Sequence, residues 1–327
     1  MALRLKTWVG VVVVLAVLGA CLGYYFWRIQ PTPSSPKKLK VGYLPLAASL
    51  PLFVASDQHY FQEAGFEVEL VQFKSGNEMA IAGSQGDLDV MVTLATNAAL
   101  DAMDVSGKKF EAFLANGYVK RTGGAKSTDY LLALPGQTLA SLKGQKVAFF
   151  PGSVSRVFAT IVLPKHGITL NDIEYVEMDG DKWLAALKSG QVKAVVAVEP
   201  YATMILDAGV AVPLIDGYIA EVFDGVPLSA AWFAGTRLQQ DDKNKIVGVF
   251  RRAVSLIESD RDRALKSFEH YTKLPPALYT KIALNRWRLS ADKDVREAFL
   301  KFARILGEQG GVRRAPEGDD WVWKNPQ

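Results

Sequence analysis

Cysteine and histidine are scarce in this chain of 327 residues. Cys21 is its one cysteine, and the three histidines, His59, His166 and His270, lie far apart in the sequence. A single cysteine excludes an intramolecular disulfide and a cysteine-based metal cluster. No histidine has a second ligand at the spacing of a zinc site. The sequence therefore predicts no metal site and no cofactor.

An excess of charge is also missing. The formal net charge is only +4, and lysine and arginine are scattered along the chain. A nucleic-acid-binding face needs clustered basic residues, so we expect no nucleic-acid partner. There is also no nucleophile elbow, P-loop, dinucleotide fingerprint or His-Glu-x-x-His motif. The absence of these motifs argues against the enzyme classes that depend on them.

What the chain does have is an apolar N-terminus. Arg4 and Lys6 precede an apolar run over residues 8–27, which is about long enough to span a bilayer as a helix. In one interpretation residues 1–30 form an uncleaved anchor helix with the basic pair in the cytoplasm. In the other, Leu18-Gly19-Ala20-Cys21 resembles a bacterial lipobox, and Cys21 would carry lipid. Both place the rest of the chain outside the cytoplasmic membrane, held off it by a Pro/Ser linker at 31–38.

From residue 40 the pattern alternates apolar strands with helices. Three strand–helix units are expected before residue 130, and three strands with two intervening helices after residue 142, which predicts two α/β lobes. The run at 86–92 resembles that at 190–196, since both turn on a glycine and enter an apolar strand. Two amphipathic helices follow after residue 240. We assign 39–130 plus 235–327 to lobe 1 and 131–234 to lobe 2, with crossings near 130–134 and 226–233.

The residues at 50–90 and 142–200 carry a family likeness. The run LPLFVASDQHYFQEAGFEVELVQFKSGNEMAIAGSQGDLDV, then SLKGQKVAFFPGSVSR and VVAVEP, resembles nitrate/sulfonate/taurine-type ABC substrate-binding proteins, including thiamine-precursor binders. The resemblance implies a type II periplasmic-binding fold with a ligand cleft between two lobes. Lys193 and Val198 depart from the family pattern, and the second departure could alter the cleft wall, so the ligand is not carried over.

Candidate ligand contacts follow from the position of the strand ends. Ligands of open α/β sheets bind where parallel strands end and helices begin. Tyr43 and Trp232 are aromatic candidates for stacking on an apolar ligand, and Glu199 is a carboxylate at a strand end. Each has an alternative structural role, as a core aromatic or in a contact between lobes. The predicted contacts are Tyr43, Leu44, Pro45, Ser75, Asn77, Thr96, Asn97, Ser153, Ser155, Glu199 and Trp232.

These observations predict a membrane-anchored, extracytoplasmic solute-binding protein. It would bind a small anionic or heteroaromatic molecule and deliver it to an ABC permease. A membrane-anchored ligand sensor on the same fold is one alternative, although the chain has no cytoplasmic signalling domain. A thiamine-pyrimidine synthase-like enzyme is less favoured, because the cysteine-rich segment of those enzymes has no counterpart here.

Overall fold

The computed structural model describes residues 35–117, 119, 126–151, 154–223, 227–235, 237–290 and 292–324. Residues 38–327 form one compact unit. The predicted N-terminal anchor and the lipidation candidate Cys21 lie outside the described residues. Within the described residues, no helix combines the length and apolarity needed to cross a membrane.

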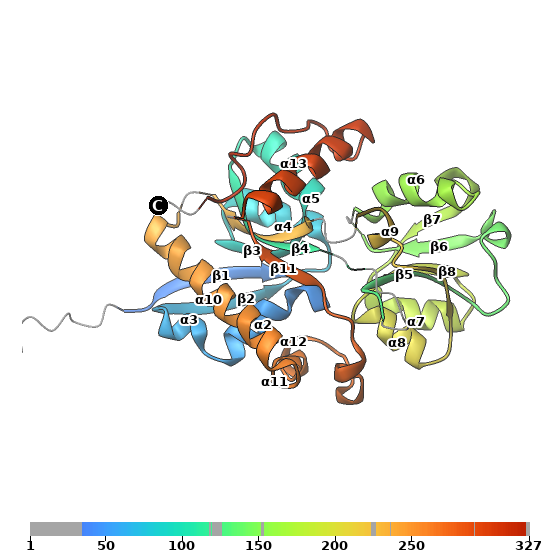
Figure 1. Cartoon of the computed structure of the whole chain (residues 1–327), viewed down its shortest axis with the longest axis horizontal. Helices are drawn as coiled ribbons and strands as arrows, with labels where there is room; N and C mark the ends of the chain where they lie inside the picture. Colours follow the sequence, from blue (N-terminus) through green and yellow to red (C-terminus); the bar gives the residue numbers. More distant parts are fainter. Residues whose placement is uncertain are drawn as a thin grey trace, which may run out of the picture. The chain divides into compact units, whose positions relative to one another are not determined.

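Two β-sheets organise the unit, and we call each sheet with its helices a lobe (Figure 1). The six-stranded sheet of lobe 1 has the order β11-β4-β10-β3-β1-β2. Its strands are β1 (Lys37–Tyr43), β2 (Phe66–Gln72), β3 (Val90–Ala95), β4 (Phe110–Gly117), β10 (Pro227–Ala234) and β11 (Arg286–Leu289). Strand β3 is a continuous apolar run that is buried along almost its whole length, as expected of a central strand covered on both faces.

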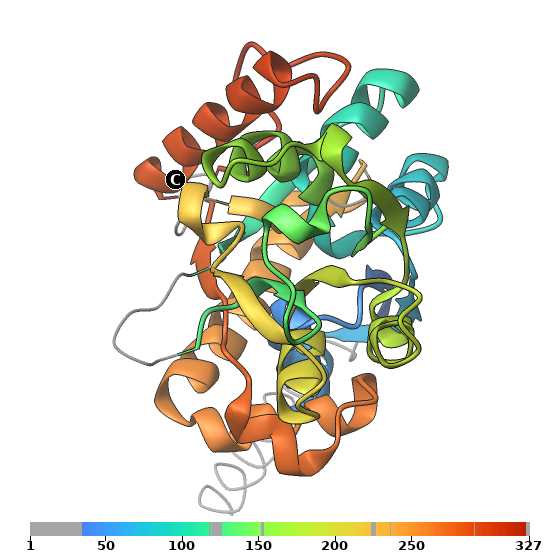
Figure 2. The ribbon, with the colours of Figure 1, turned by 90° about the vertical axis from the view of Figure 1, so that its right-hand side faces the viewer.

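Helices cover both faces of the first sheet, and Figures 1 and 2 show the two groups on opposite sides. One face carries α2 (Leu50–Asp57), α3 (Tyr60–Glu63), α10 (Gln240–Ser259), α11 (Arg261–Leu265) and α12 (Phe268–Tyr271), with the short 3-10 turns η1 (Ala47–Ser49) and η4 (Pro276–Lys281). The other carries α4 (Gly76–Gln85), α5 (Thr96–Ser106) and α13 (Lys293–Glu308). The two predicted C-terminal helices are confirmed as α10 and α13, whose apolar stripes are buried against the lobe.

Lobe 2 is built on a five-stranded sheet of order β7-β6-β8-β5-β9. Its strands are β5 (Asp129–Ala133), β6 (Lys146–Phe149), β7 (Glu174–Glu177), β8 (Ala194–Val198) and β9 (Val212–Asp216). Its helices are α6 (Ser155–Lys165), α7 (Gly180–Lys188), α8 (Tyr201–Asp207) and α9 (Ala220–Phe223), with 3-10 turns η2 (Ala140–Leu142) and η3 (Leu170–Asp172). Helices α6 and α9 pack together on one face, and α7 and α8 on the other.

The two sheets share one plan. In lobe 1 the parallel strands β2, β1 and β3 are followed by the antiparallel β10, and in lobe 2 β7, β6 and β8 are followed by the antiparallel β5. The similar runs at 86–92 and 190–196 lead into β3 and β8, the third parallel strand of each sheet. The two-lobed α/β architecture expected from the sequence is therefore confirmed.

Strand β10 differs from the sequence-based assignment. Residues 227–234 were assigned to lobe 2, but β10 pairs with β3 and β4 of the first sheet. The chain enters lobe 2 between the end of β4 and the start of β5, and it returns between α9 and β10. The first crossing thus comes just before the segment predicted for it, and the second overlaps only the start of its predicted segment. An apolar strand pattern does not reveal which sheet completes its hydrogen bonding. The remaining lobe boundaries stay a prediction.

Candidate functional site

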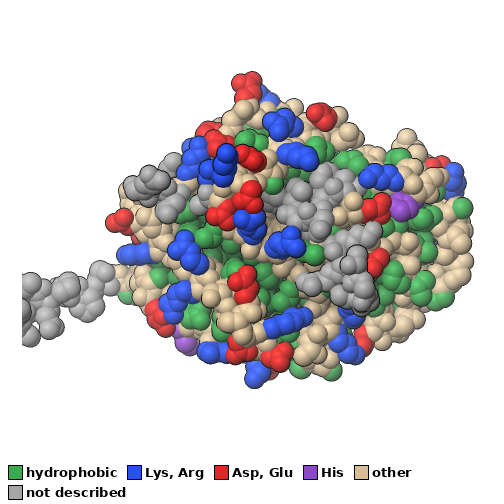
Figure 3. Space-filling model, in the orientation of Figure 1, with side chains coloured by type: hydrophobic (Ala, Val, Ile, Leu, Met, Phe, Trp, Pro, Cys, Tyr) green, Lys and Arg blue, Asp and Glu red, His purple; other side chains and the backbone are tan. Residues whose placement is uncertain are grey.

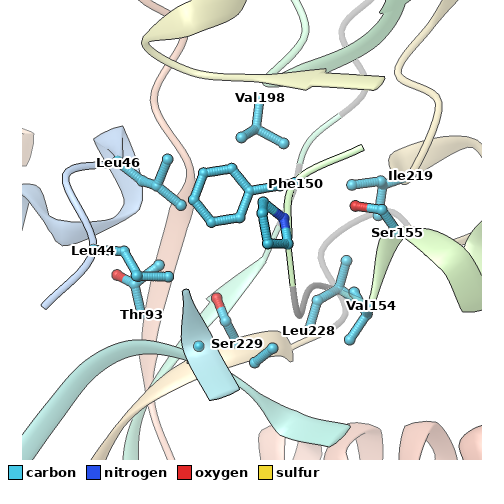
Figure 4. Close-up of a pocket in the computed structure, with 13 residues that line it drawn as sticks. Leu44, Leu46, Thr93, Phe150, Val154, Ser155, Val198, Ile219, Leu228 and Ser229 are labelled. Carbon is cyan, nitrogen blue, oxygen red and sulfur yellow. The ribbon is translucent and has the colours of Figure 1, made fainter. Parts of the chain in front are cut away.

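A small pocket lies where the two lobes meet (Figure 4). Its volume is about 40 Å³. Lobe 1 contributes the ends of β1 and β3, the start of α4 and the first part of β10, and lobe 2 contributes the ends of β6 and β8 and the start of α6. The pocket is lined by Leu44, Leu46, Gly76, Thr93, Ala95, Leu228 and Ser229 of lobe 1 and by Phe150, Pro151, Val154, Ser155, Val198 and Ile219 of lobe 2. We call it the inner pocket.

The walls of the inner pocket are almost wholly apolar, and none of its lining residues is charged. Figure 4 shows two hydroxyl groups directed into it from opposite lobes, those of Ser155 and Ser229. Both serines are buried, with relative exposures of 2% and 5%. An apolar cavity with a few fixed polar groups is the usual form of a small-molecule site.

Three helices begin at the inner pocket. Gly76 is the first residue of α4, Ala95 is the N-cap of α5, and Ser155 opens α6. Each of these helices has 10 or 11 residues, long enough for its N-terminal N–H groups to carry a partial positive charge. With two of them in lobe 1 and one in lobe 2, a polar group bound in the pocket meets oriented donors from both lobes.

A larger compartment of about 430 Å³ adjoins the inner pocket, with Phe150 in the wall of both. We call it the outer pocket. Tyr201, Tyr271 and Phe73 supply aromatic surface. Charged side chains of both signs also line it, with Lys74 and Lys273 in lobe 1 and Asp179 and Asp181 in lobe 2. Basic and acidic side chains are similarly interspersed over the face of the molecule shown in Figure 3.

Thr93 forms part of the inner wall in an unusual backbone conformation. Its φ is +64°, a left-handed value that is a genuine outlier for a β-branched residue. Its hydroxyl lies 2.8 Å from that of Ser49, which itself donates to the carbonyl of Leu44 at 2.7 Å. Because Ser49 has one proton, Thr93 is the donor in the Thr93–Ser49 pair. This buried chain of hydrogen bonds connects the ends of β1 and β3 and stabilises the strained turn.

Glu199 connects the lobes. Its carboxylate accepts hydrogen bonds from the backbone N–H and hydroxyl of Thr203 and from the N–H of Ala283, at 3.1, 2.8 and 3.2 Å. Its carbonyl accepts from the N–H of Ala47 in lobe 1, at 3.0 Å. Burial raises the pKa of Glu199 to about 7, although these hydrogen bonds and the cation of Lys126 oppose the shift. Glu199 does not line either pocket, so its position supports the interlobe role rather than ligand contact.

Asp129 is a second buried carboxylate, at the start of β5. It accepts from the N–H of Ile219, which lines the inner pocket, and from the hydroxyl of Thr128 at 3.3 Å. Burial raises its pKa to about 7, against the lowering effect of hydrogen bonds from Ile219, Ala220 and Thr128. No sequence motif pointed to this residue, because only the paired strands show that it is fully enclosed.

Apart from Glu199 and Trp232, the predicted contacts come from four strand-to-helix turns, and each turn has a residue that lines the inner pocket, namely Leu44, Gly76, Ala95 and Ser155. Leu44 and Ser155 line it, and Pro45 lines the outer pocket. Ser75, Asn77, Thr96 and Asn97 belong to the same turns but are not among the lining residues. Ser75 instead caps α4 by accepting from the N–H of Glu78. Ser153 lies outside the described residues. Ligand contact by any of these residues stays a prediction.

The two predicted aromatic contacts lie in the core. Trp232 is fully buried, stacks on Trp321, and donates its indole N–H to the carbonyl of Leu94 at 3.1 Å. Tyr43 packs edge-on against Phe53 and Tyr271. The aromatic ring nearest the pocket is instead Phe150, at the end of β6 (Figure 4). Ser229 was also missed, because an isolated serine within an apolar strand has no motif.

Comparison with known proteins identifies the relatives of this chain. The sequence profile of the NMT1-like family matches residues 32–265. A putative aliphatic sulfonates-binding protein of Escherichia coli (strain K12) is 27% identical over 259 residues, covering 74% of this chain and 74% of that protein. The resemblance inferred from the sequence is therefore confirmed.

Two solved structures share the fold. The alkanesulfonate-binding protein SsuA from Xanthomonas axonopodis pv. citri, bound to MOPS, matches with a TM-score of 0.70 and 21% identity over 89% of this chain and 99% of that one. The periplasmic nitrate-binding protein NrtA from Synechocystis PCC 6803 matches with a TM-score of 0.66 and 12% identity over 86% of this chain and 84% of that one. The relative from Escherichia coli and both of these structures are named as binding proteins.

Proposed function

The chain belongs to the NMT1-like family, and we propose that it is the extracytoplasmic solute-binding component of an ABC importer. The observation that carries the proposal is the inner pocket, where helices of both lobes begin around an uncharged, apolar cavity. A ligand held there contacts both lobes at once. Its release to a permease then requires the lobes to separate.

The proposed ligand is a small anionic or heteroaromatic molecule. The starts of α4, α5 and α6 favour a group that accepts hydrogen bonds or carries negative charge. The apolar walls and the ring of Phe150 favour a nonpolar body. The relatives are named as sulfonate-binding and nitrate-binding proteins, and these names support an anionic ligand. We propose Leu44 and Ser155 as ligand contacts, one from each lobe.

Binding is expected to close the cleft without chemical change to the ligand. The two chain crossings give the lobes a hinge, and a ligand that touches both lobes favours the closed state. The contacts of Glu199 with Ala47 and Ala283 help to hold the lobes together in that state.

The proposal is tested by screening candidate ligands for binding to the compact unit, residues 38–327. Sulfonates, nitrate, carboxylates and pyrimidine-like compounds are scored by thermal stabilisation, which follows mass action for a ligand that binds the folded state. At least one compound should stabilise the protein, decrease the radius of gyration in solution scattering, and be recovered unaltered. Turnover of the compound would indicate an enzyme. A panel without any binder would contradict the proposal.

We also propose that residues 1–30 attach the protein to the membrane, by lipid on Cys21 or as an uncleaved helix. The apolar run at 8–27 supports both modes. Expression of the full chain with a Cys21→Ala variant separates them, since only lipidation requires the thiol. Labelled lipid should be incorporated by the wild type alone in the first mode and by neither protein in the second. Recovery of the full-length wild type in unanchored form contradicts both.

A further inference from the structure

A tyrosine from each lobe lines the outer pocket. Tyr271 of α12 belongs to lobe 1 and Tyr201 of α8 to lobe 2. Both residues are half-buried rather than enclosed in the core. Phe73 and Phe150 add two more rings to the lining, again one from each lobe. Aromatic surface is therefore available to a ligand from both sides of this compartment.

Both tyrosine rings are held in place by their own lobes. Tyr271 stacks on Phe53 with ring centroids 4.7 Å apart, and its hydroxyl donates to the carboxylate of Asp57 at 2.9 Å. Tyr201 packs closely on Gly180, where an added Cβ would lie 2.4 Å from the ring. A ligand therefore meets rings that are already ordered, which lowers the entropy cost of binding.

The two pocket volumes decide where an aromatic ring can lie. A cavity of about 150 Å³ accommodates benzene. The inner pocket, at about 40 Å³, is too small for a ring, whereas the outer pocket has about 430 Å³. The inner pocket has space for roughly three water-sized groups, which suits the oxygens of a sulfonate or carboxylate. A ligand that fills both pockets places its compact anionic group in the inner one and its ring beyond Phe150.

We propose that the outer pocket is an aryl subsite, in which Tyr201 and Tyr271 contact the ring of an aromatic anion whose acidic group occupies the inner pocket. This inference rests on the proposed function and narrows the ligand class to arylsulfonates, aryl carboxylates and anions of similar shape. The charged residues of the lining, two lysines and two aspartates, cancel in formal charge and so do not favour a second charged group over an uncharged ring. Aromatic pairs also bind more tightly than their buried area alone accounts for.

Pairs of anions that differ only in the ring test the aryl subsite. Benzenesulfonate is compared with cyclohexanesulfonate, and benzoate with cyclohexanecarboxylate, by calorimetry or ligand-observed NMR. The wild type should bind an aryl anion about 2- to 10-fold more tightly than its cyclohexyl counterpart, which corresponds to one aromatic pair. Burial of apolar area alone predicts the opposite order, because the cyclohexyl group is the more hydrophobic. Methanesulfonate, which has no ring, should bind at least about 10-fold more weakly than benzenesulfonate.

Variants identify the rings responsible. Tyr201→Leu and Tyr271→Leu should each lower the ratio of aryl to cyclohexyl affinity toward one. Tyr201→Phe keeps the ring and should keep the ratio. Tyr60→Leu is the matched control and should leave the ratio unchanged, because Tyr60 is a half-buried tyrosine of lobe 1 that lines neither pocket. The ratio compares two ligands on the same protein, so a partial loss of folded protein does not affect it.

The outcomes separate this inference from the proposed function. Binding of a cyclohexyl anion or of methanesulfonate as tightly as of the aryl anion would overturn the inference and leave a solute-binding protein. Binding confined to compounds other than aryl anions would do the same. An unchanged ratio in both leucine variants would also overturn it, since the two rings would then take no part in the preference. If no compound of these pairs or of the screening panel binds, the proposed function itself is contradicted.

Discussion

Ser229 and Asp129 occupy corresponding places in the two lobes. Each lies near the start of the strand by which the chain enters its lobe, β10 for Ser229 and β5 for Asp129. Each is opposite the end of the third parallel strand, with Ser229 paired to Ala95 and Asp129 to Val198. Both also bind a neighbouring segment on the other side of their strand, through Asn116 and Ile219 respectively.

The chemistry at these two places differs. Ser229 presents a hydroxyl to the pocket, and its oxygen accepts a hydrogen bond from the Asn116 amide. Asp129 directs its carboxylate at backbone N–H groups of its own lobe and at Thr128. The comparison shows that one position of a shared plan can face a pocket in one lobe and hold the backbone in the other. A polar residue near a cleft is therefore not by itself a ligand contact.

The largest effect is expected from Asp129→Ala. This change leaves the buried N–H groups of Ile219 and Ala220 without their acceptor and opens a small cavity, so the free energy of unfolding should fall by about 3 kcal/mol. Ser229→Ala removes one hydrogen bond and should cost only about 1 kcal/mol. Urea denaturation measures both. Equal losses in the two variants would contradict the division of roles between these residues.

The buried carboxylates of lobe 2 also predict a pH dependence that the neutral pair of lobe 1 lacks. Burial raises the pKa values of Glu199 and Asp129 to about 7 in the folded state. Between about pH 4.5 and pH 7 the folded protein therefore binds more protons than the unfolded chain, and its stability decreases as pH rises. For Glu199 the decrease amounts to roughly 2–3 kcal/mol.

Denaturation of the wild type and of Glu199→Gln at pH 5 and pH 8 measures this contribution. The variant should show a smaller loss of stability between the two pH values, because its side chain cannot ionise. Glu174→Gln serves as the control, since the Glu174 side chain is exposed at 57%. A Glu199→Gln variant with the same pH dependence as the wild type would show that the carboxylate is not responsible.

Glycine-to-alanine changes in helices of the two lobes should have opposite signs. At Gly180, the first residue of α7, an added Cβ would lie 2.4 Å from the ring of Tyr201 in the outer pocket. The ring must move, and we expect a loss of about 2 kcal/mol in unfolding free energy. At Gly248, inside α10 of lobe 1, the added Cβ would have no atom within 4 Å among the described residues beyond its own stretch of helix. Gly248→Ala should stabilise the protein, by up to about 1 kcal/mol. Thermal denaturation of both variants shows which substitution lowers the stability of the protein and which raises it.

A small effect is expected from Thr93→Val in lobe 1. Valine keeps the shape and the β-branching of the residue, so the strained backbone and the pocket wall remain similar. The hydrogen bond to Ser49 is lost, and stability should decrease by about 1 kcal/mol. Thr93→Ser keeps the hydroxyl and should lose less. If the serine variant loses as much as the valine variant, the methyl group rather than the hydrogen bond stabilises the turn.

The sequence determined the fold class, the pairing of two similar halves and the turns that reach the cleft. These features depend on local periodicity and on glycine and cap residues, which act within a few positions of the chain. The family likeness over residues 50–90 and 142–200 added the class of protein, and the profile match confirmed it. Leu44, Pro45 and Ser155 were named from strand-to-helix turns, and each of them lines one of the two pockets, while ligand contact stays a prediction.

Only the tertiary structure decided which lobe contains β10, that Trp232 is a core residue, and that Glu199 connects the lobes. It also showed that Ser229 is beside Asn116, 113 positions earlier in the chain. The physical reason is that strand pairing and burial arise from long-range contacts. A serine or a carboxylate in an apolar strand has the same local pattern whether it faces a ligand, a backbone N–H or the core, and only the packed sheets distinguish these environments.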